Sequence, residues 1–397
     1  MPTKIFITGI TGYIGGDTFY RLHENNPNSD FEFSALIRSN EKAQQVRAKY
    51  PHVRTVIGDL DDADKITKEA AWADVVIRMF FVCSSYVLRT LVIYITPPSS
   101  PHHEHATAAN RDSIGHKQAT NNATDTADSS DHVGAANAIA KGLVEGHTAQ
   151  RPGYWLHTGG TGILTYFDSE VRKTAGEHDD KIFNDWDGVD ELVNLPAGAF
   201  HRNVDELVLQ TGTRYADRVK TAIICPPTIY GVGRGPVPTR GRQVYELTTF
   251  ILRGGYVPLI GRGLARWNNV HVRDLSRLFE ALVRVAGDSS RKDDGEVWGA
   301  KGYFLSENGE HVWGELSKAI GEEVFKQGFR AQQPESKALS LDEAVKSPAG
   351  FEAASWGWNS RAAALRGEKV LGWKAEEKSL LEEVPEIVRS EAARLGL

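Results

Sequence analysis

The fold is decided by the N-terminal stretch Lys4-Ile5-Phe6-Ile7-Thr8-Gly9-Ile10-Thr11-Gly12-Tyr13-Ile14-Gly15-Gly16. Residues 4–8 are mostly β-branched or aromatic, which predicts a short buried strand. Three glycines follow, and the apolar residues Tyr13, Ile14, Phe19 and Leu22 suit the buried face of a helix. Such a strand, glycine turn and helix N-terminus form an anion site, because free backbone N–H groups and the helix dipole face a phosphate there. The stretch therefore predicts dinucleotide binding, with a glycine-rich turn that binds nothing as the alternative.

The spacing Gly-x-x-Gly-x-x-Gly, with Thr8 before it and Tyr13-Ile14-Gly15 within it, resembles the extended short-chain dehydrogenase/reductase family. That group includes nucleotide-sugar epimerases, dehydratases and reductases. The resemblance implies an α/β fold, namely a Rossmann-type doubly wound parallel sheet with a smaller C-terminal substrate lobe. It also implies bound NAD or NADP, held in this stretch by Thr8, Gly9, Thr11, Gly12, Tyr13, Ile14 and Gly15.

The composition is that of an ordinary globular protein. The chain has 397 residues, of which 41% are hydrophobic and 25% charged, and its net charge of -6 gives no reason to expect nucleic acid or an anionic membrane as a partner. Its two cysteines, Cys83 and Cys225, make no disulfide framework. No basic and apolar leader precedes the first strand, so a cytoplasmic enzyme or sensor is expected.

The second predicted strand, residues 31–38, ends in Arg38-Ser39, with Lys42 one turn later. An Asp or Glu at this point would bond the ribose hydroxyls of NAD, whereas an Arg can pair with the 2′-phosphate of NADP. The sequence therefore favours NADP, with NAD as the alternative cofactor. If no phosphate binds there, Arg38 is a solvated surface charge.

The third predicted strand, residues 53–57, is followed by Asp59 and Leu60. The family resemblance places this Asp-Leu pair beside the adenine of the cofactor. A strand-ending turn followed by a helix is the plainer interpretation, with Asp61 or Asp62 as the N-cap. The two interpretations are compatible.

About fifty residues of unusual character separate the fourth predicted strand, 73–77, from a helix expected to begin near Asp131. A doubly wound sheet needs only a short connection here, so residues 78–125 are interpreted as an insertion, such as a translated intron. A membrane span through its apolar first half is disfavoured by Arg89 in the middle. His102, His103 and His105 are expected to form a solvated loop, and no metal site is predicted.

The fifth predicted strand, residues 154–158, runs into Gly159-Gly160-Thr161-Gly162. In the family, a Ser or Thr hydroxyl at this strand end bonds the substrate oxygen beside the nicotinamide. Thr158 and Thr161 are the available hydroxyls, and Thr161 is the preferred match. A plain glycine turn without chemistry is the alternative.

The acid/base residue of the family is a Tyr with a Lys four positions later, which lowers the pKa of the phenol. None of the twelve tyrosines of this chain has a Lys at that position, and the helix expected to start near Ala199 contains no Tyr. Phe200 stands where the ring is expected and has no proton to give. His201 could act instead as the base, and Arg202 could hold the nicotinamide ribose.

The sixth predicted strand, 219–225, ends in Pro226-Pro227-Thr228-Ile229-Tyr230-Gly231. This run resembles the family's Pro-x-x-Ile/Val-Tyr-Gly turn, so Pro226, Thr228 and Ile229 are expected to contact the cofactor. Two prolines and a glycine also make a stiff turn without any ligand. Further on, Asp274 is expected to cap a helix through Val285, and His271 to pack internally.

Two functions remain open. The first is an NAD(P)-dependent oxidoreductase or epimerase-like enzyme acting on a carbonyl or secondary alcohol of a small molecule. The second is a non-catalytic NADP(H) sensor similar to the NmrA-like regulators, which lack the Tyr/Lys pair. The expected division is a Rossmann domain at 1–232 and a substrate lobe at 233–397 that partly returns to it. The helix at 197–212 leaves a homodimer open.

Overall fold

The computed structural model describes residues 2–26, 30–79 and 131–397. Most of the predicted insertion, with His102, His103 and His105, therefore lies outside the described residues. Its first two positions belong to the sheet region, since Arg78 ends a strand and Met79 is buried in the core. Of the helices in the described part of the chain, none is long and apolar enough to cross a membrane.

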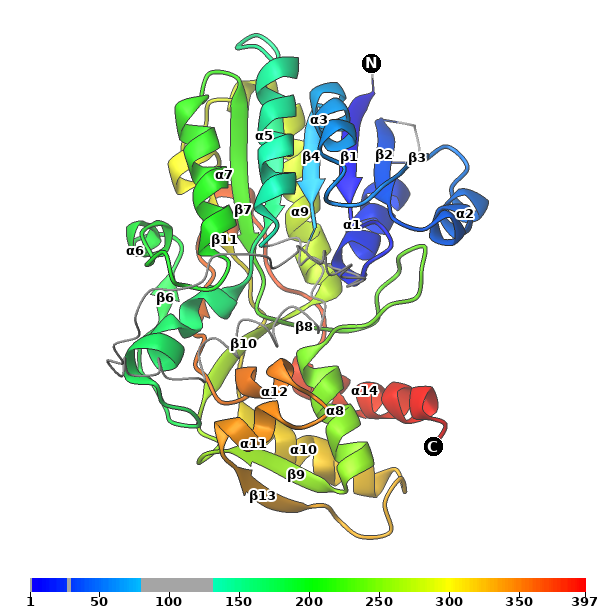
Figure 1. Cartoon of the computed structure of the whole chain (residues 1–397), viewed down its shortest axis with the longest axis vertical. Coiled ribbons are helices and arrows are strands. Elements are labelled where there is room, and N and C mark those ends of the chain that lie inside the picture. Colours follow the sequence, from blue (N-terminus) through cyan, green and yellow to red (C-terminus); the bar gives the residue numbers. More distant parts are fainter. Residues whose placement is uncertain (1, 27–29, 80–130) are drawn as a thin grey trace, which may run out of the picture.

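A sheet of seven parallel strands forms the centre of the molecule, in the order β11-β7-β5-β4-β1-β2-β3 (Figure 1). From β1 the chain moves outward through β2 to β3, returns to β4 beside β1, and then moves outward on the other side. This is the doubly wound order, so the predicted fold class is confirmed. The strands are β1 (Thr3–Thr8), β2 (Phe31–Ile37), β3 (Arg54–Ile57), β4 (Val75–Arg78), β5 (Gly153–Thr158), β7 (Val219–Cys225) and β11 (Tyr303–Leu305).

Helices cover both faces of the sheet, because alternate strand residues point to opposite sides and both sides are apolar. On one face Ile7 and Ile77 pack in the same core as Phe19 of α1, and on the other Val76 and Trp155 share a core with α5. The first face carries α1 (Tyr13–Glu24), α2 (Asn40–Lys49) and α9 (Val272–Gly287). The second carries α3 (Ala63–Trp72), α5 (Val133–Gly146) and α7 (Arg202–Arg214).

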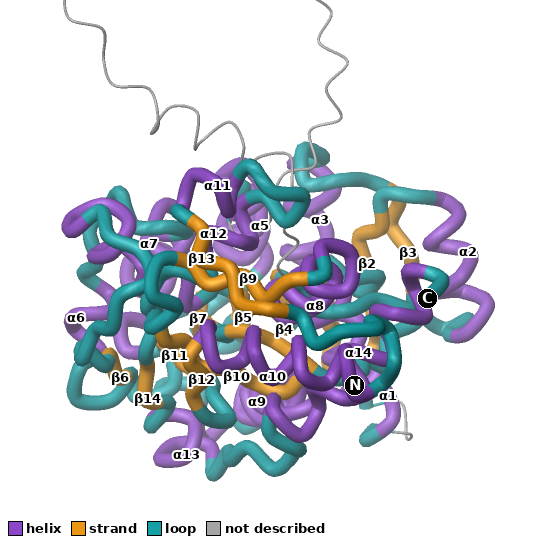
Figure 2. Tube along the Cα trace, turned by 90° about the horizontal axis from the view of Figure 1, so that it is seen from below, coloured by secondary structure: helices purple, strands orange, loops and turns teal. Residues whose placement is uncertain are grey.

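A smaller lobe lies below the sheet in Figure 1, and Figure 2 views the molecule from that side. Its core is separate from the two cores of the sheet. It contains α8 (Gln243–Gly254), β9 (Tyr256–Ile260), α10 (Trp313–Lys326), β13 (Glu335–Leu339), α11 (Leu341–Val345), α12 (Phe351–Ser355) and α14 (Leu380–Leu395). The shorter elements between lobe and sheet are β6 (Phe183–Asn184), α6 (Val189–Val193), β8 (Thr228–Tyr230), β10 (Arg266–His271), β12 (Glu310–Val312), β14 (Ala362–Ala363) and α13 (Arg366–Leu371).

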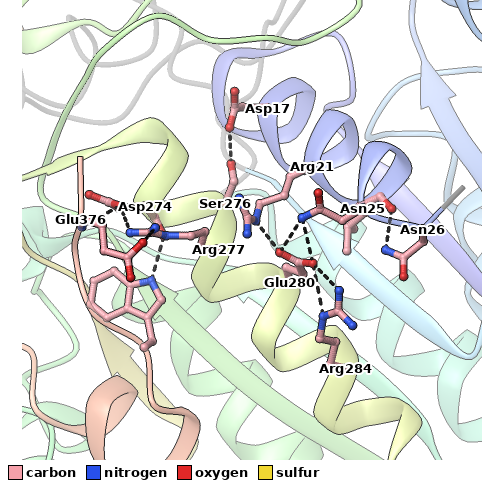
Figure 3. Close-up of polar contacts among 12 residues, drawn as sticks. Asp17, Arg21, Asn25, Asn26, Asp274, Ser276, Arg277, Glu280, Arg284 and Glu376 are labelled. Atoms are coloured by element: carbon pink, nitrogen blue, oxygen red, sulfur yellow. Dashed lines mark hydrogen bonds and ion pairs between the residues drawn. The ribbon is translucent and has the colours of Figure 1, made fainter. Parts of the chain in front are cut away.

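The long segment between β8 and α8 is bound to α1 by a buried carboxylate. Asp17, two residues after Gly15, is fully buried and accepts hydrogen bonds from the backbone N–H of Arg234 (2.9 Å) and from its guanidinium (both 2.8 Å). The hydroxyl of Ser276 on α9 donates to the same carboxylate at 2.7 Å (Figure 3). Asp17 therefore joins α1, the segment after β8, and α9.

Further along the same two helices, Glu280 of α9 receives hydrogen bonds from α1 (Figure 3). Arg21 forms an ion pair with it, and the side-chain amide of Asn25 donates to both of its oxygens at 3.1 and 3.2 Å. Arg284 donates to the same carboxylate at 2.7 Å. Hydrogen bonds and an ion pair thus join α1 to α9 in addition to the apolar contacts between the two helices.

We expect Asp17→Asn to destabilise the protein by roughly 3 kcal/mol near neutral pH, because Asn cannot balance the Arg234 charge. This loss of stability lies at the low end of the range for a broken buried ion pair, because the Arg234 side chain is 25% exposed. Burial alone would raise the pKa of Asp17, but the hydrogen bonds from Arg234 and Ser276 outweigh it and lower the pKa.

A carboxyl with a lowered folded-state pKa contributes stability above its unfolded pKa of ~3.9, and this is lost as the pH falls through the folded value. The deficit of Asp17→Asn in denaturant unfolding should therefore shrink in acid. Asp217→Asn, which alters an exposed ion pair with Arg218, is the matched control and should leave stability unchanged. A deficit that is independent of pH would contradict the role given to the Asp17 charge.

Candidate active site

The carboxyl ends of the central strands meet at one edge of the sheet, where the predicted site residues gather. Thr8 of β1 pairs with Arg78 of β4, and Arg78 in turn pairs with His157 of β5. Just beyond β4, the Met79 N–H donates to the Thr8 hydroxyl at 3.3 Å, and the Thr158 hydroxyl contacts the Met79 sulfur at 3.3 Å. The hydroxyls of Thr8 and Thr158 thus fix the end of β4.

The glycine turn between β1 and α1 has the geometry that an anion site needs. Gly9 has a φ of 86°, which favours glycine, and its carbonyl accepts the N–H of Gly12 at 2.8 Å. Gly15 cannot carry a side chain, because an added Cβ would lie 2.3 Å from the Gly9 carbonyl oxygen. Gly12 is the N-cap of α1 and has no side chain with which to cap this helix. The turn therefore fits the diphosphate of a dinucleotide.

Two further members of the predicted cofactor set fill the core around this turn. Ile14 is buried in the first turn of α1, and Thr11 is buried in the turn itself. The phenol of Tyr13 donates to the carbonyl of Gly231, beyond β8, and Tyr245 donates to the same oxygen at 2.9 Å. The phenol of Tyr13 thus links α1 to the segment after β8. Burial raises the pKa of Tyr13 well above its usual value, so it is a poor proton donor.

The residues expected around the adenosine end follow neighbouring strands. Arg38 is exposed at the end of β2, and Ser39 caps α2 by accepting the Lys42 N–H at 3.4 Å. Asp59 is exposed after β3, and its N–H donates to the carboxylate of Asp62 at 3.0 Å. Leu60 is partly buried against the core of α3 and α5. Since β1, β2 and β3 are adjacent, these groups lie along one edge with the glycine turn.

The turn after β7 is joined to the end of β5. The Pro226 carbonyl accepts the N–H of Thr161 at 3.0 Å, and the Thr228 hydroxyl donates to Gln243 at 2.9 Å. Ile229 is half-buried against the core around α1 and α9. The predicted nicotinamide-end residues and the preferred catalytic hydroxyl are thus neighbours.

Thr161 itself is held by the C-terminal lobe. Its hydroxyl accepts the indole N–H of Trp267 at 3.1 Å, and its carbonyl accepts the Ser360 hydroxyl at 2.7 Å. The side chain is 1% exposed. Two segments that lie about 100 and 200 residues further along the chain therefore set the orientation of this hydroxyl.

His201 is the N-cap of α7, which begins at Arg202 and not near Ala199 as expected. Its backbone is left-handed, with φ 66°, and apart from Lys173 no other non-glycine residue in the described ranges has a positive φ. Such strain is typical of functional positions. The ring nitrogen Nδ1 lies 3.1 Å from a carboxylate oxygen of Asp131.

The other ring nitrogen of His201 faces the glycine turn after β5. A Cβ placed on Gly160 would lie 3.7 Å from Nε2, and one placed on Gly162 would lie 4.0 Å away. Burial of Asp131 opposes its ionisation, but the charge and hydrogen bond of His201 outweigh this and lower the pKa of that carboxyl. The carboxylate and the imidazole thus face each other beside the turn that carries Thr161.

Sequence reasoning missed a second, deeper His–Asp pair. Asp205 lies one helical turn after His201, and its carboxylate is 3.4 Å from Nε2 of His157 and 3.1 Å from the hydroxyl of Tyr303. The thiol of Cys225 donates a hydrogen bond to the same Tyr303 hydroxyl at 3.0 Å. Burial lowers the pKa of His157 to about 4, so this ring is neutral near pH 7. The sequence did contain a signal for Asp205. It stands four positions after His201, and four positions also separate the Tyr and the Lys of the family.

Arg202, the third predicted catalytic residue, is not brought to this group. It lines a pocket of about 490 Å³ on the flank of α7, together with Val193 of α6, Leu209 and Ala300. The structure therefore brings Thr161 and His201 together with the nicotinamide-end turn. Arg202 instead lines the pocket on the flank of α7.

Comparison with known proteins agrees with this architecture. No protein-family model matches the chain. The oxidase ucsJ of Acremonium sp is 36% identical over 403 aligned positions, which cover 100% of both chains. Among solved structures, the dTDP-glucose 4,6-dehydratase DesIV of Streptomyces venezuelae, with NAD and TYD bound, superimposes with a TM-score of 0.61 at 15% identity, covering 99% of this chain and 98% of that one.

The UDP-glucose 4-epimerase of Thermotoga maritima, with UDP-glucose, superimposes with a TM-score of 0.59 at 13% identity over 99% of this chain and 100% of the epimerase. Identities this low show a shared fold, whereas the full-length match to ucsJ shows kinship. The chain therefore belongs to the family of the oxidase ucsJ, and it shares its fold with the dehydratase and the epimerase, as the resemblance of the glycine motif implied.

Proposed function

We propose that the protein is an NAD(P)-dependent oxidoreductase or epimerase-like enzyme in which His201, held by Asp131, moves the proton. The observation that carries this proposal is the strained His201 backbone, which directs Nδ1 to a carboxylate and Nε2 to the turn of Thr161. Kinship with an oxidase supports an enzyme over a sensor.

The dinucleotide, held by the turn of Gly9, Gly12 and Gly15, would supply the hydride donor or acceptor. NADP is the proposed form, because Arg38 and Lys42 follow β2 where a 2′-phosphate would need cations. DesIV binds NAD in its structure, and NAD is therefore the alternative here.

The chain itself would position the substrate oxygen and handle its proton. Asp131 favours the tautomer with hydrogen on Nδ1, which leaves Nε2 as the base for an alcohol. After proton uptake, the same carboxylate stabilises the imidazolium, which is the acid for a carbonyl. Thr161, oriented by Trp267, is proposed to bond the substrate oxygen. This arrangement replaces the phenol and ammonium of the family by imidazole and carboxylate.

We further propose that the protein forms a homodimer through α5 and α7. A groove of about 580 Å³ runs between these helices, with polar and charged residues such as Lys141 and Glu206 in its lining. Its apolar members Ala140, Val144 and Leu207 are only partly buried. A second copy of the same two helices would cover these side chains.

His201→Gln should lower kcat by about 10²–10⁴-fold, because the neutral amide cannot exchange a proton. Binding of NADPH should stay unchanged, since the glycine turn is intact. The assay is NADPH oxidation with a panel of aldehydes and ketones, together with NADP reduction by secondary alcohols. His178→Gln, which alters an exposed ion pair with Asp180, is the control. Tight NADPH binding by wild type without turnover of any substrate would support the sensor instead.

Arg38→Ala should weaken NADPH binding by about ten- to a hundredfold in calorimetric titration, because a charged hydrogen bond is worth about 1.5–3 kcal/mol. NADH binding should change little. Arg47→Ala is the control, since Arg47 is an exposed cation on α2 that bonds Thr55. Equal losses for both cofactors would contradict the assignment of Arg38 to the 2′-phosphate.

Leu207→Glu should shift the protein from dimer to monomer in light scattering coupled to size exclusion, because it replaces an apolar contact of the groove between α5 and α7 by a carboxylate that has no assigned partner in the interface. Leu381→Glu, at an apolar residue that is 61% exposed on α14, should leave the mass unchanged. A monomeric wild type would refute the proposed dimer.

A further inference from the structure

A series of ring side chains runs from the proposed catalytic imidazole into the C-terminal lobe. The ring centroids of His201 and Phe200 are 3.9 Å apart, and those of Phe200 and Phe351 are 5.7 Å apart. Phe351 in turn contacts Trp358 edge to face, with centroids 6.0 Å apart. Phe200 lies just before α7, whereas Phe351 begins α12 of the lobe. We call Phe200, Phe351 and Trp358 the aromatic row.

The aromatic row stands apart from the hydrophobic cores. Among the described residues, none of its three rings belongs to the two cores of the sheet or to the core of the lobe. Phe200 and Phe351 are only partly buried, although burial is what makes a large apolar side chain stabilise a fold. Grouped rings that stay partly exposed beside reactive groups are typical of a surface that contacts a ligand.

Phe200 faces the turn that carries Thr161. A Cβ added to Gly162 would lie 3.3 Å from the Cδ1 atom of the Phe200 ring and 4.0 Å from Nε2 of His201. Phe200 also occupies the position at which the family resemblance leads us to expect a phenol. This ring has no proton to give, but it can pack against a substrate whose oxygen is bound by Thr161 and His201.

The polar side chains that accompany Phe351 on α12 have partners within the protein. Glu352 forms an ion pair at 2.8 Å with Arg242, the N-cap residue of α8, and Nη1 of that arginine is buried. Ser355 accepts a hydrogen bond from Gln243 at 3.1 Å. A nucleotide sugar would need cations for its diphosphate, and the charge of Arg242 is already balanced by a carboxylate.

We propose that the substrate carries an aromatic ring next to its reacting carbonyl or secondary alcohol, and that Phe200 and Phe351 bind this ring. Aromatic rings attract one another in offset and edge-to-face arrangements, so the substrate ring would extend the row by the contacts that hold its members together. The inference rests on the proposed function, because it names the substrate class of the same site.

The test compares 1-phenylethanol with 1-cyclohexylethanol, two secondary alcohols with the same carbon skeleton. Each is titrated calorimetrically into the full-length protein, alone and with saturating NADPH, since an alcohol is not oxidised by the reduced cofactor. Apolar burial alone would favour the saturated ring, which is the more hydrophobic of the two. Contacts with the aromatic row should reverse this order, so that 1-phenylethanol binds about two- to tenfold more tightly.

Three variants assign the preference to the row. Phe200→Leu and Phe351→Leu keep an apolar side chain and remove one ring, so each should lower the affinity ratio of the two alcohols toward one. Phe351→Tyr retains the ring and should retain the ratio. Phe325→Leu, at an aromatic residue that is 44% exposed on α10, is the matched control and should bind both alcohols as wild type does. Every variant should still bind NADPH, which distinguishes a lost ring contact from unfolding.

The same experiment separates this inference from the proposed function. A preference for 1-phenylethanol that depends on Phe200 and Phe351, without NADP reduction by any alcohol, would support the aromatic site and remove the proposed reaction. Equal or absent binding of the two alcohols by wild type would overturn the inference, and so would a preference that both leucine variants retain. Saturable binding of UDP-glucose in place of both alcohols would also overturn it.

Discussion

The buried carboxylate of Asp17 is the interaction on which the geometry of the candidate site depends. It lies on α1 two residues after Gly15, and it accepts hydrogen bonds from Arg234 of the segment after β8 and from Ser276 of α9. In the proposed complex, the glycine turn and the turn after β7 would contact opposite ends of the dinucleotide. Because Asp17 connects the elements that carry them, the span between these two turns is fixed before any ligand arrives.

The catalytic group proposed here is assembled from segments far apart in the chain. Asp131 precedes α5, His201 precedes α7, and Thr161 is held from the C-terminal lobe by Trp267 and Ser360. The lobe is therefore part of the site and not a cover placed over it. In the proposed reaction, an imidazole on a strained backbone takes the place of the phenol, and Asp205, four positions after His201, has the charge opposite to that of the family's Lys.

The sequence was sufficient for the doubly wound fold class and the glycine turn, because both rest on local patterns of apolar residues and glycines. It was insufficient where a residue's role depends on distant partners. Asp274 was expected to cap α9, but His271 caps it, with Nδ1 accepting the Arg273 N–H at 3.1 Å. The Asp274 carboxylate instead accepts the N–H groups of Glu376 and Glu377, about 100 residues away. His271 is buried as expected.

The edge strand β11 is synthesised late, although it belongs to the central sheet. It pairs with β7 but follows it by about eighty residues along the chain. The elements β8, α8, β9, β10 and α9 lie between them in the sequence. Helix α9, which packs on α1, also comes late, and Ser276 is separated from Asp17 by 259 residues. A nascent chain therefore cannot complete the dinucleotide domain until more than three hundred residues have left the ribosome, and its exposed sheet edge must be protected until then.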